Sequence, residues 1–163
     1  MRTALHVPLF PAIIAMIMAQ LSKVFIERWK RKTWNWSLLF RTGSMPSSHT
    51  ALVTALTGTL WLSYGWRSPW VSTTTVVAMI VMHDAIGVRR QAGEQAVVIY
   101  ELVHQVQISG LKLTTSDILH RSRWRRQGHT PLEVVGGLLI GVVVAWLTFV
   151  FDNPAALHFL STR

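Results

Sequence analysis

The chain has 163 residues, half of them hydrophobic, with 16 Lys and Arg against 7 Asp and Glu and a formal charge of +9. The length predicts one domain over residues 1–163, and the absence of cysteine excludes a disulfide framework, a thiolate metal site and a cysteine nucleophile. Such a charge in a soluble protein would indicate a nucleic acid or another anionic surface. A mean hydropathy of +0.35 instead indicates a membrane protein in which the charge lies outside apolar runs.

Apolar segments follow one another along the chain, and they cover Val7–Ile26, Thr50–Tyr64, Trp70–Met82 and Pro131–Phe151. A membrane-crossing helix needs about 17–25 residues, so the second and third segments are near the lower limit. Between the third and fourth, residues 96–106 (AVVIYELVHQV) show helical spacing of apolar residues, which predicts an amphipathic helix. We therefore expect an all-α polytopic membrane bundle of about four transmembrane helices plus an amphipathic helix. The alternative is the core of a soluble helical bundle.

The basic residues are concentrated in two of the predicted loops. The loop between the first two segments holds 6 and the loop between the last two holds 7, so 13 of the 16 lie on one side of the membrane. The positive-inside rule places these loops in the cytoplasm and both termini outside. Aromatic belts then form at both interfaces. The outer belt consists of Trp61, Trp66 and Trp70, and the inner belt consists of Trp29, Trp34 and Trp36. Contact with anionic membrane lipids explains the charge, and no nucleic acid partner is expected.

Polar residues that topology does not explain gather at the predicted cytoplasmic helix ends. In TGSMPSSH (residues 42–49), Pro46 fits the first turn of a helix. The free N–H groups of that turn, with the hydroxyls of Ser47 and Ser48, are suited to bind an anion. His49 can carry a proton near neutral pH. A serine-capped helix with an interfacial histidine explains the same residues without a ligand.

Two further groups belong to the same membrane face. Gln20 and Lys23 lie at the inner end of the first segment, and Lys23 either takes part in a site or extends to the interface. In HDAIGVRRQAGEQA (residues 83–96), the carboxylate of Asp84 is suited to hold the guanidinium of Arg89 or Arg90 for anion binding.

The last group is SRWRRQGHTPLEV (residues 122–134). Thr130, Pro131 and Glu133 have the spacing of a capping box at the start of a helix. Glu133 also lies one helical turn from His129, where a carboxylate would hold the imidazole in one tautomer. Two histidines at helix starts, with several cations on one membrane face, match what phosphoryl transfer to histidine requires.

These motifs resemble those of the type-2 phosphatidic acid phosphatase superfamily, which includes vanadium haloperoxidases. PSSH is similar to its PSGH motif, and SRWRRQGHTPLE is similar to its last motif, Ser-Arg, five residues, His, three residues, Asp. TGSMPSSH, DAIGVRRQAGEQA and GHTPLEV most resemble a divergent branch of small membrane proteins, over roughly residues 16–150. The first superfamily motif, Lys, six residues, Arg-Pro, is degenerate here, since Lys23 is followed by Lys30-Arg31 and no proline.

The resemblance implies a phosphatidic acid phosphatase-like core and a metal-independent, cofactor-free phosphatase acting on a lipid phosphate or diphosphate at the cytoplasmic face. It implies that His129 is the nucleophile, that Glu133 orients it and that His49 is the general acid. The implied phosphate ligands are Lys23, Ser47, Ser48 and Arg123, and we expect Asp84, Arg89 and Arg90 to form part of the same clamp.

Other functions fit the same residues. A non-catalytic membrane protein would bind anionic lipid or a phosphorylated ligand in this pocket, and a haloperoxidase would hold vanadate there. A homo-oligomer is also compatible with the sequence, because we expect Gly136, Gly137 and Gly141 to be exposed and to allow two helices to approach closely.

Overall fold

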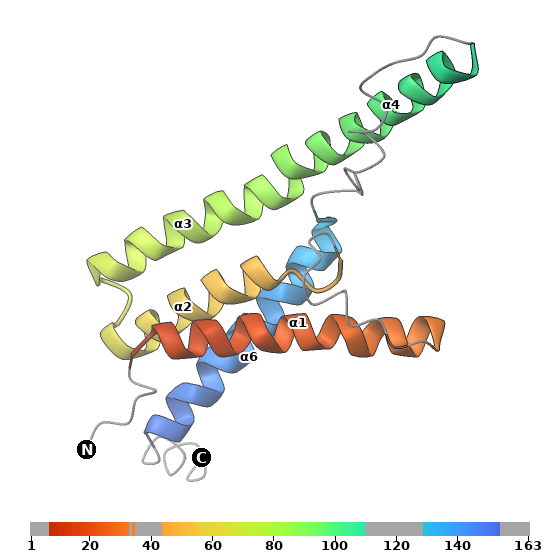
Figure 1. Cartoon of the computed structure of the whole chain (residues 1–163). Helices are drawn as coiled ribbons and strands as arrows, with labels where there is room; N and C mark the ends of the chain where they lie inside the picture. The colour runs from red at the N-terminus through yellow and green to blue at the C-terminus, as the bar shows by residue number, and fades with distance from the viewer. Residues whose placement is uncertain (1–6, 33, 35–43, 110–128, 154–163) are drawn as a thin grey trace.

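The computed structural model describes residues 7–32, 34, 44–109 and 129–153 of the chain. The described residues form five α-helices, drawn in Figure 1: α1 (Leu9–Arg31), α2 (Ser48–Tyr64), α3 (Pro69–Ile86), α4 (Val88–Ile108) and α6 (Pro131–Asp152). The prediction of an all-α fold is confirmed. Each predicted apolar segment lies within or largely overlaps one helix.

Length and composition identify the helices that suit a membrane. Three helical stretches are long and apolar enough to cross one: Leu9–Trp29, Pro69–Val106 and Pro131–Asp152. The second of them joins α3 to α4. Helix α2 has 17 residues, at the lower limit of the range of about 17–25 for a crossing helix. Together they agree with the predicted membrane bundle.

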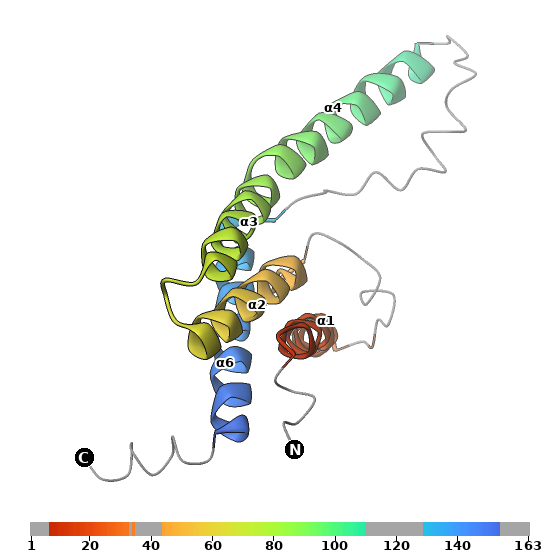
Figure 2. The ribbon, with the colours of Figure 1, turned by 90° about the vertical axis from the view of Figure 1, so that its left-hand side faces the viewer.

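Helix α2 occupies the centre of the bundle, next to α1, α3 and α6 (Figures 1 and 2). Small side chains make this packing close: the buried core contains Ala15 and Ala19 from α1 with Ala51 and Ala55 from α2. Small residues allow helix backbones to approach, which is how helices associate where lipid surrounds them. The most extensive of these helix contacts is between α2 and α6.

Glycines on α6 make that approach possible. A Cβ atom added at Gly141 would lie 2.6 Å from the Cβ of Thr54 and 2.7 Å from the backbone oxygen of Ala51. Gly137 is likewise buried, against the backbone oxygen of Ser47. The prediction that these two glycines are exposed for contact with a second copy is therefore wrong, because α2 covers them. A homo-oligomer stays a prediction without support from this glycine face.

Helix α4 continues past the end of α3 and leads away from the bundle (Figures 1 and 2). Gly87 separates the two helices, and its N–H donates to the carbonyl of His83 at 2.8 Å. The predicted amphipathic stretch, residues 96–106, is the second half of α4, which begins earlier than expected, at Val88. Arg89 and Arg90 therefore lie in the first turn of this helix.

Candidate functional site

Two backbone hydrogen bonds bring the three sequence motifs to the same end of the bundle. The N–H of Ser47 donates to the carbonyl of Glu133 at 2.9 Å, and the N–H of His129 donates to the carbonyl of Ala85 at 2.9 Å. The first bond joins the start of α2 to the start of α6, and the second joins the start of α6 to the end of α3. Segments far apart in the sequence are thus fixed together by main-chain atoms.

The start of α2 is a capped helix end. Ser47 is its N-cap, and the Ser47 hydroxyl oxygen accepts from the N–H of Thr50 at 3.4 Å and from the Thr50 hydroxyl at 3.0 Å. Ser47 and Ser48 are both buried, whereas His49 is exposed. Ser47 therefore has the structural role that the simpler interpretation predicted. Thr50 was not among the predicted site residues, although its spacing from Ser47 is the one that capping requires.

His129 lies just before α6 and is only 5% exposed. Its Nδ1 lies 2.9 Å from the Oε2 atom of Glu133, and the same oxygen accepts from the N–H of Thr130 at 3.0 Å. The Thr130 hydroxyl accepts in turn from the N–H of Glu133, which completes the predicted capping box. A carboxylate accepts only from a protonated nitrogen, so neutral His129 carries its proton on Nδ1 and its lone pair on Nε2. Glu133 thus caps the start of α6 and also holds the imidazole of His129.

Lys23 is buried inside the bundle, at 3% exposure, on the face of α1 that meets the other helices. Its charge interacts with the carboxylate of Glu133 and with His49. Snorkelling to the interface does not describe this side chain. A buried ammonium needs a partner that compensates its charge. For Lys23 the carboxylate of Glu133 supplies that opposite charge.

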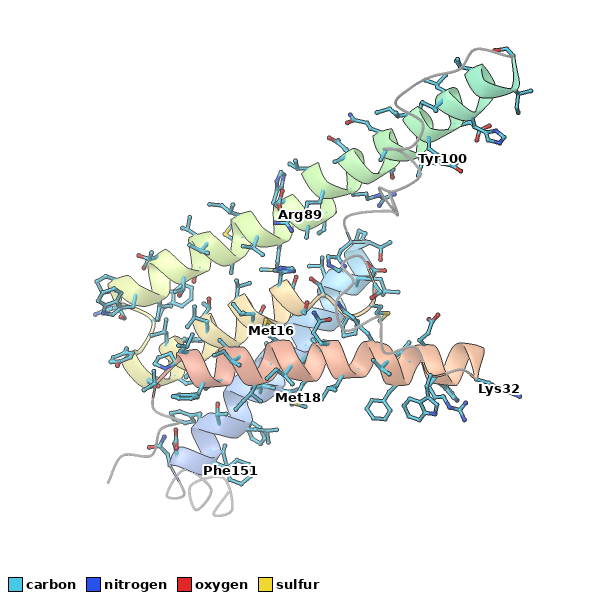
Figure 3. All side chains as sticks on the ribbon, viewed as in Figure 1. Met16, Met18, Lys32, Arg89, Tyr100 and Phe151 are labelled. Carbon is cyan, nitrogen blue, oxygen red and sulfur yellow. The ribbon has the colours of Figure 1, made fainter. Side chains whose placement is uncertain are left out.

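Arg89 donates from its Nε atom to the Oδ2 atom of Asp84, and both side chains remain partly exposed. Figure 3 shows Arg89 close to the junction of α3 and α4. The charges of Asp84 and Arg89 interact with His49, as do those of Lys23 and His129. Charged groups from α1, α3, α4 and the start of α6 are therefore near enough to His49, in the first turn of α2, to act on it electrostatically.

Two of the predicted phosphate ligands are not part of this cluster as it is described. The Nε atom of Arg90 donates to Glu94 Oε1 at 3.0 Å, and both side chains are exposed along α4. Arg123 lies outside the described residues. Within the described ranges, no three His, Asp or Glu side chains gather closely enough to hold a metal ion.

The sequence comparisons agree with this arrangement. The model of the Divergent PAP2 family matches residues 5–144, which is most of the chain. The chain belongs to the Divergent PAP2 family. An uncharacterized membrane protein, YuiD of Bacillus subtilis (strain 168), is 38% identical over 144 residues, which cover 84% of this chain and 90% of that protein. No solved structure is significantly similar to the chain.

Membership of the Divergent PAP2 family confirms the resemblance that the sequence motifs indicated, and the chain is a membrane protein related to these phosphatases. Among the described residues, the buried side-chain atoms without a hydrogen-bond partner include Gln20 Oε1 and Ser44 Oγ. Gln20 lies shortly before Lys23 in the sequence, and Ser44 lies shortly before Ser47.

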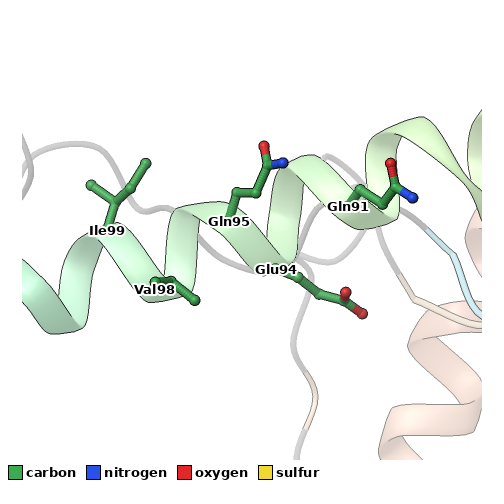
Figure 4. Close-up of a pocket in the computed structure, with 5 residues that line it drawn as sticks. All are labelled: Gln91, Glu94, Gln95, Val98 and Ile99. Atoms are coloured by element: carbon green, nitrogen blue, oxygen red, sulfur yellow. The ribbon is translucent and has the colours of Figure 1, made fainter.

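A pocket on α4 provides a contrast with the histidine cluster (Figure 4). Its lining residues are Gln91, Glu94, Gln95, Val98 and Ile99, all on one helix. This lining offers neutral amides, apolar side chains and one carboxylate, and no cation. It therefore lacks the cations that bind phosphate, whereas the cluster around His49 includes Lys23 and Arg89.

Proposed function

We propose that the protein is an integral membrane phosphatase that hydrolyses a lipid phosphate or diphosphate through a phosphohistidine at the cytoplasmic face. The observation that carries the proposal is the buried His129, held at Nδ1 by Glu133 at 2.9 Å, in a cluster with a second histidine and two cations. Fixing Nδ1 leaves Nε2 as the nucleophilic nitrogen. No other arrangement among the described residues combines these groups.

In the first step, Nε2 of His129 attacks phosphorus and the bond from phosphorus to the leaving oxygen breaks. His49, exposed at the start of α2, gives a proton to that oxygen. Lys23 and Arg89 supply positive charge for the equatorial oxygens, whose charge is spread in the transition state. The imidazolium that forms on His129 is stabilised by the carboxylate of Glu133.

In the second step, a water molecule attacks the phosphohistidine. His49, now neutral, takes one proton from this water, and the bond from phosphorus to Nε2 of His129 breaks. Inorganic phosphate leaves, and both histidines return to their starting states. Each proton in this cycle passes between the substrate, the water molecule and the two imidazoles. The two steps therefore balance without a further reactant.

The helices support a lipid as the substrate. Large apolar side chains are exposed along α1 and α6, among them Ile17, Met18, Leu139 and Val143. Such faces suit acyl or isoprenoid chains, and the cluster lies at one end of the bundle, where a headgroup would lie. The phosphate of a lipid would then reach Lys23 and His129 while its tail stays among the helices.

The test is phosphate release by the purified protein in detergent from a panel of lipid phosphates and diphosphates. We expect release from at least one lipid, none from His129→Ala, and a base-stable, acid-labile label on the wild-type chain from radiolabelled substrate. Arg67→Gln, at an exposed position in the turn between α2 and α3, is the matched control and should behave like wild type. Equal release by wild type and His129→Ala would refute the proposal.

A binding function at the same site has one observation in its favour. Arg89 is already paired with Asp84, so a phosphate has to compete for this guanidinium. A non-catalytic protein would bind lipid phosphate with an affinity that falls in Lys23→Met, yet release no phosphate from any lipid. The same assay therefore separates the two functions.

A further inference from the structure

The last turns of α1 and the residues just after it carry a second group of cations and aromatic side chains, away from the histidine cluster. It consists of Phe25, Arg28, Trp29, Lys32 and Trp34. With about 3.6 residues per turn, helix positions 25, 28, 29 and 32 lie on the side opposite to position 23. The exposure values agree, since the group includes Trp29 at 87% and Phe25 at 61%, whereas the inward-facing lysine is buried. This face of α1 is turned away from the bundle.

Contacts within the group hold its members in place. The rings of Phe25 and Trp34 meet edge to face, with 6.1 Å between their centroids, and the Cζ atom of Arg28 lies 5.6 Å from the Trp34 ring centroid. A cation–π contact uses no N–H donor, so the guanidinium edge stays able to bind an anion. Lys32 ends the helix, with its N–H donating to the carbonyl of Arg28 at 2.9 Å. Figure 3 shows Lys32 at the far end of α1.

The position of the group along α1 decides what surrounds it. The apolar stretch Leu9–Trp29 has 21 residues, and at about 1.5 Å per residue it matches a hydrocarbon core about 30 Å thick. Residues 25–34 therefore lie where the stretch leaves the hydrocarbon. Aromatic rings are favoured at that depth, and lysine and arginine there meet lipid headgroups.

We propose that these five residues, the α1 headgroup site, bind the phosphate of an anionic phospholipid of the bilayer. The site has two cations and no acidic member, so an anion complements it. A second copy of the chain would present the same positive face and be repelled. Glu27 is the nearest acidic residue on α1, and helical spacing places it on the Lys23 side. The proposal does not depend on phosphatase activity.

The test is native mass spectrometry of the full-length protein in neutral detergent, titrated with phosphatidylglycerol or phosphatidylcholine. We expect the double variant Arg28→Gln/Lys32→Gln to bind the first retained phosphatidylglycerol about fivefold to thirtyfold more weakly than wild type. Phosphatidylcholine binding should not change. The matched control is Arg2→Gln/Arg67→Gln, which loses the same two charges elsewhere and should keep its affinity.

A second variant separates a specific site from general charge. Trp34→Leu keeps every cation but removes the ring that positions Arg28, and it should weaken phosphatidylglycerol binding severalfold with no change in net charge. Equal losses in the site variant and the control variant would overturn the proposal, as would equal affinity for the two lipids. Unchanged binding in Trp34→Leu would overturn the role of the aromatic contact. These readouts do not involve phosphate release, so they stand apart from the enzyme assay.

Discussion

Replacing Gly141 with alanine tests the close contact between α2 and α6. The added Cβ would lie 2.6 Å from the Cβ of Thr54, 2.7 Å from the oxygen of Ala51 and 3.0 Å from the nitrogen of Ala55. Carbon atoms pack at about 3.5–4.0 Å, so α6 has to move by about 1 Å. Two of the three obstructing atoms belong to the backbone and cannot rotate away.

The size of the effect follows from two opposing contributions. Overpacking a well-packed contact costs about 1–3 kcal/mol, and the backbone obstruction puts Gly141→Ala near the upper end. Alanine returns about 1 kcal/mol through its higher helix propensity. The expected net destabilisation is about 2 kcal/mol, which corresponds to a fall of roughly 4–8 °C in Tm for a chain of this size.

The assay is thermal unfolding in detergent, followed by tryptophan fluorescence. Gly136→Ala is the matched control: its Cβ would lie 3.3 Å from the Cβ of Pro46 and 3.5 Å from the Cε of Met45, which are side-chain atoms. It should match or slightly exceed the wild-type Tm. If Gly141→Ala melts together with Gly136→Ala, the reasoning about this helix contact is refuted.

Three further changes probe the histidine cluster. Glu133→Gln should keep the helix cap but lower phosphate release about 10- to 100-fold, because an amide stabilises imidazolium on His129 less than a carboxylate does. Lys23→Met should abolish most activity without lowering Tm, since it replaces a buried charge with an apolar side chain of similar length. Asp84→Asn should raise KM for lipid phosphate severalfold by releasing Arg89 from its fixed position, with kcat changed less.

For each of these three variants, one result would contradict the prediction. Wild-type turnover in Glu133→Gln would show that the imidazole needs no carboxylate. A lower Tm in Lys23→Met would mean that the ammonium stabilises the fold. An unchanged KM in Asp84→Asn, measured alongside Arg67→Gln, would remove the ion pair from the site.

The sequence predicted the fold well where a local signal determines the structure. The start of α6 is marked by three residues, Thr130, Pro131 and Glu133, and all three have the predicted capping roles. The first apolar segment ends at Ile26, but helix α1 continues to Arg31. The apolar pattern marks only the part of a helix that suits the hydrocarbon core of a membrane. The helix itself can continue beyond that part, because helical hydrogen bonds do not need apolar surroundings.

The arrangement of the site was predictable only in part. The pairing of Asp84 with Arg89 was predicted from their closeness in the sequence, although the two residues are five positions apart and lie on different helices. Arg90 with Glu94 is an i, i+4 pair that the helix spacing rule would have found. The bond from His129 to the carbonyl of Ala85 has no sequence signature, because any residue has a carbonyl. Side-chain types do not encode which main-chain atoms meet.

These main-chain bonds also bear on how the protein is made. Both of them involve the start of α6, which is the last of the described helices to leave the ribosome. A chain inserted only as far as α4 already contains Lys23, His49 and Arg89 but has neither His129 nor the bonds that gather the helix ends. The proposed phosphatase site would therefore be complete only after α6 has docked against the other helices.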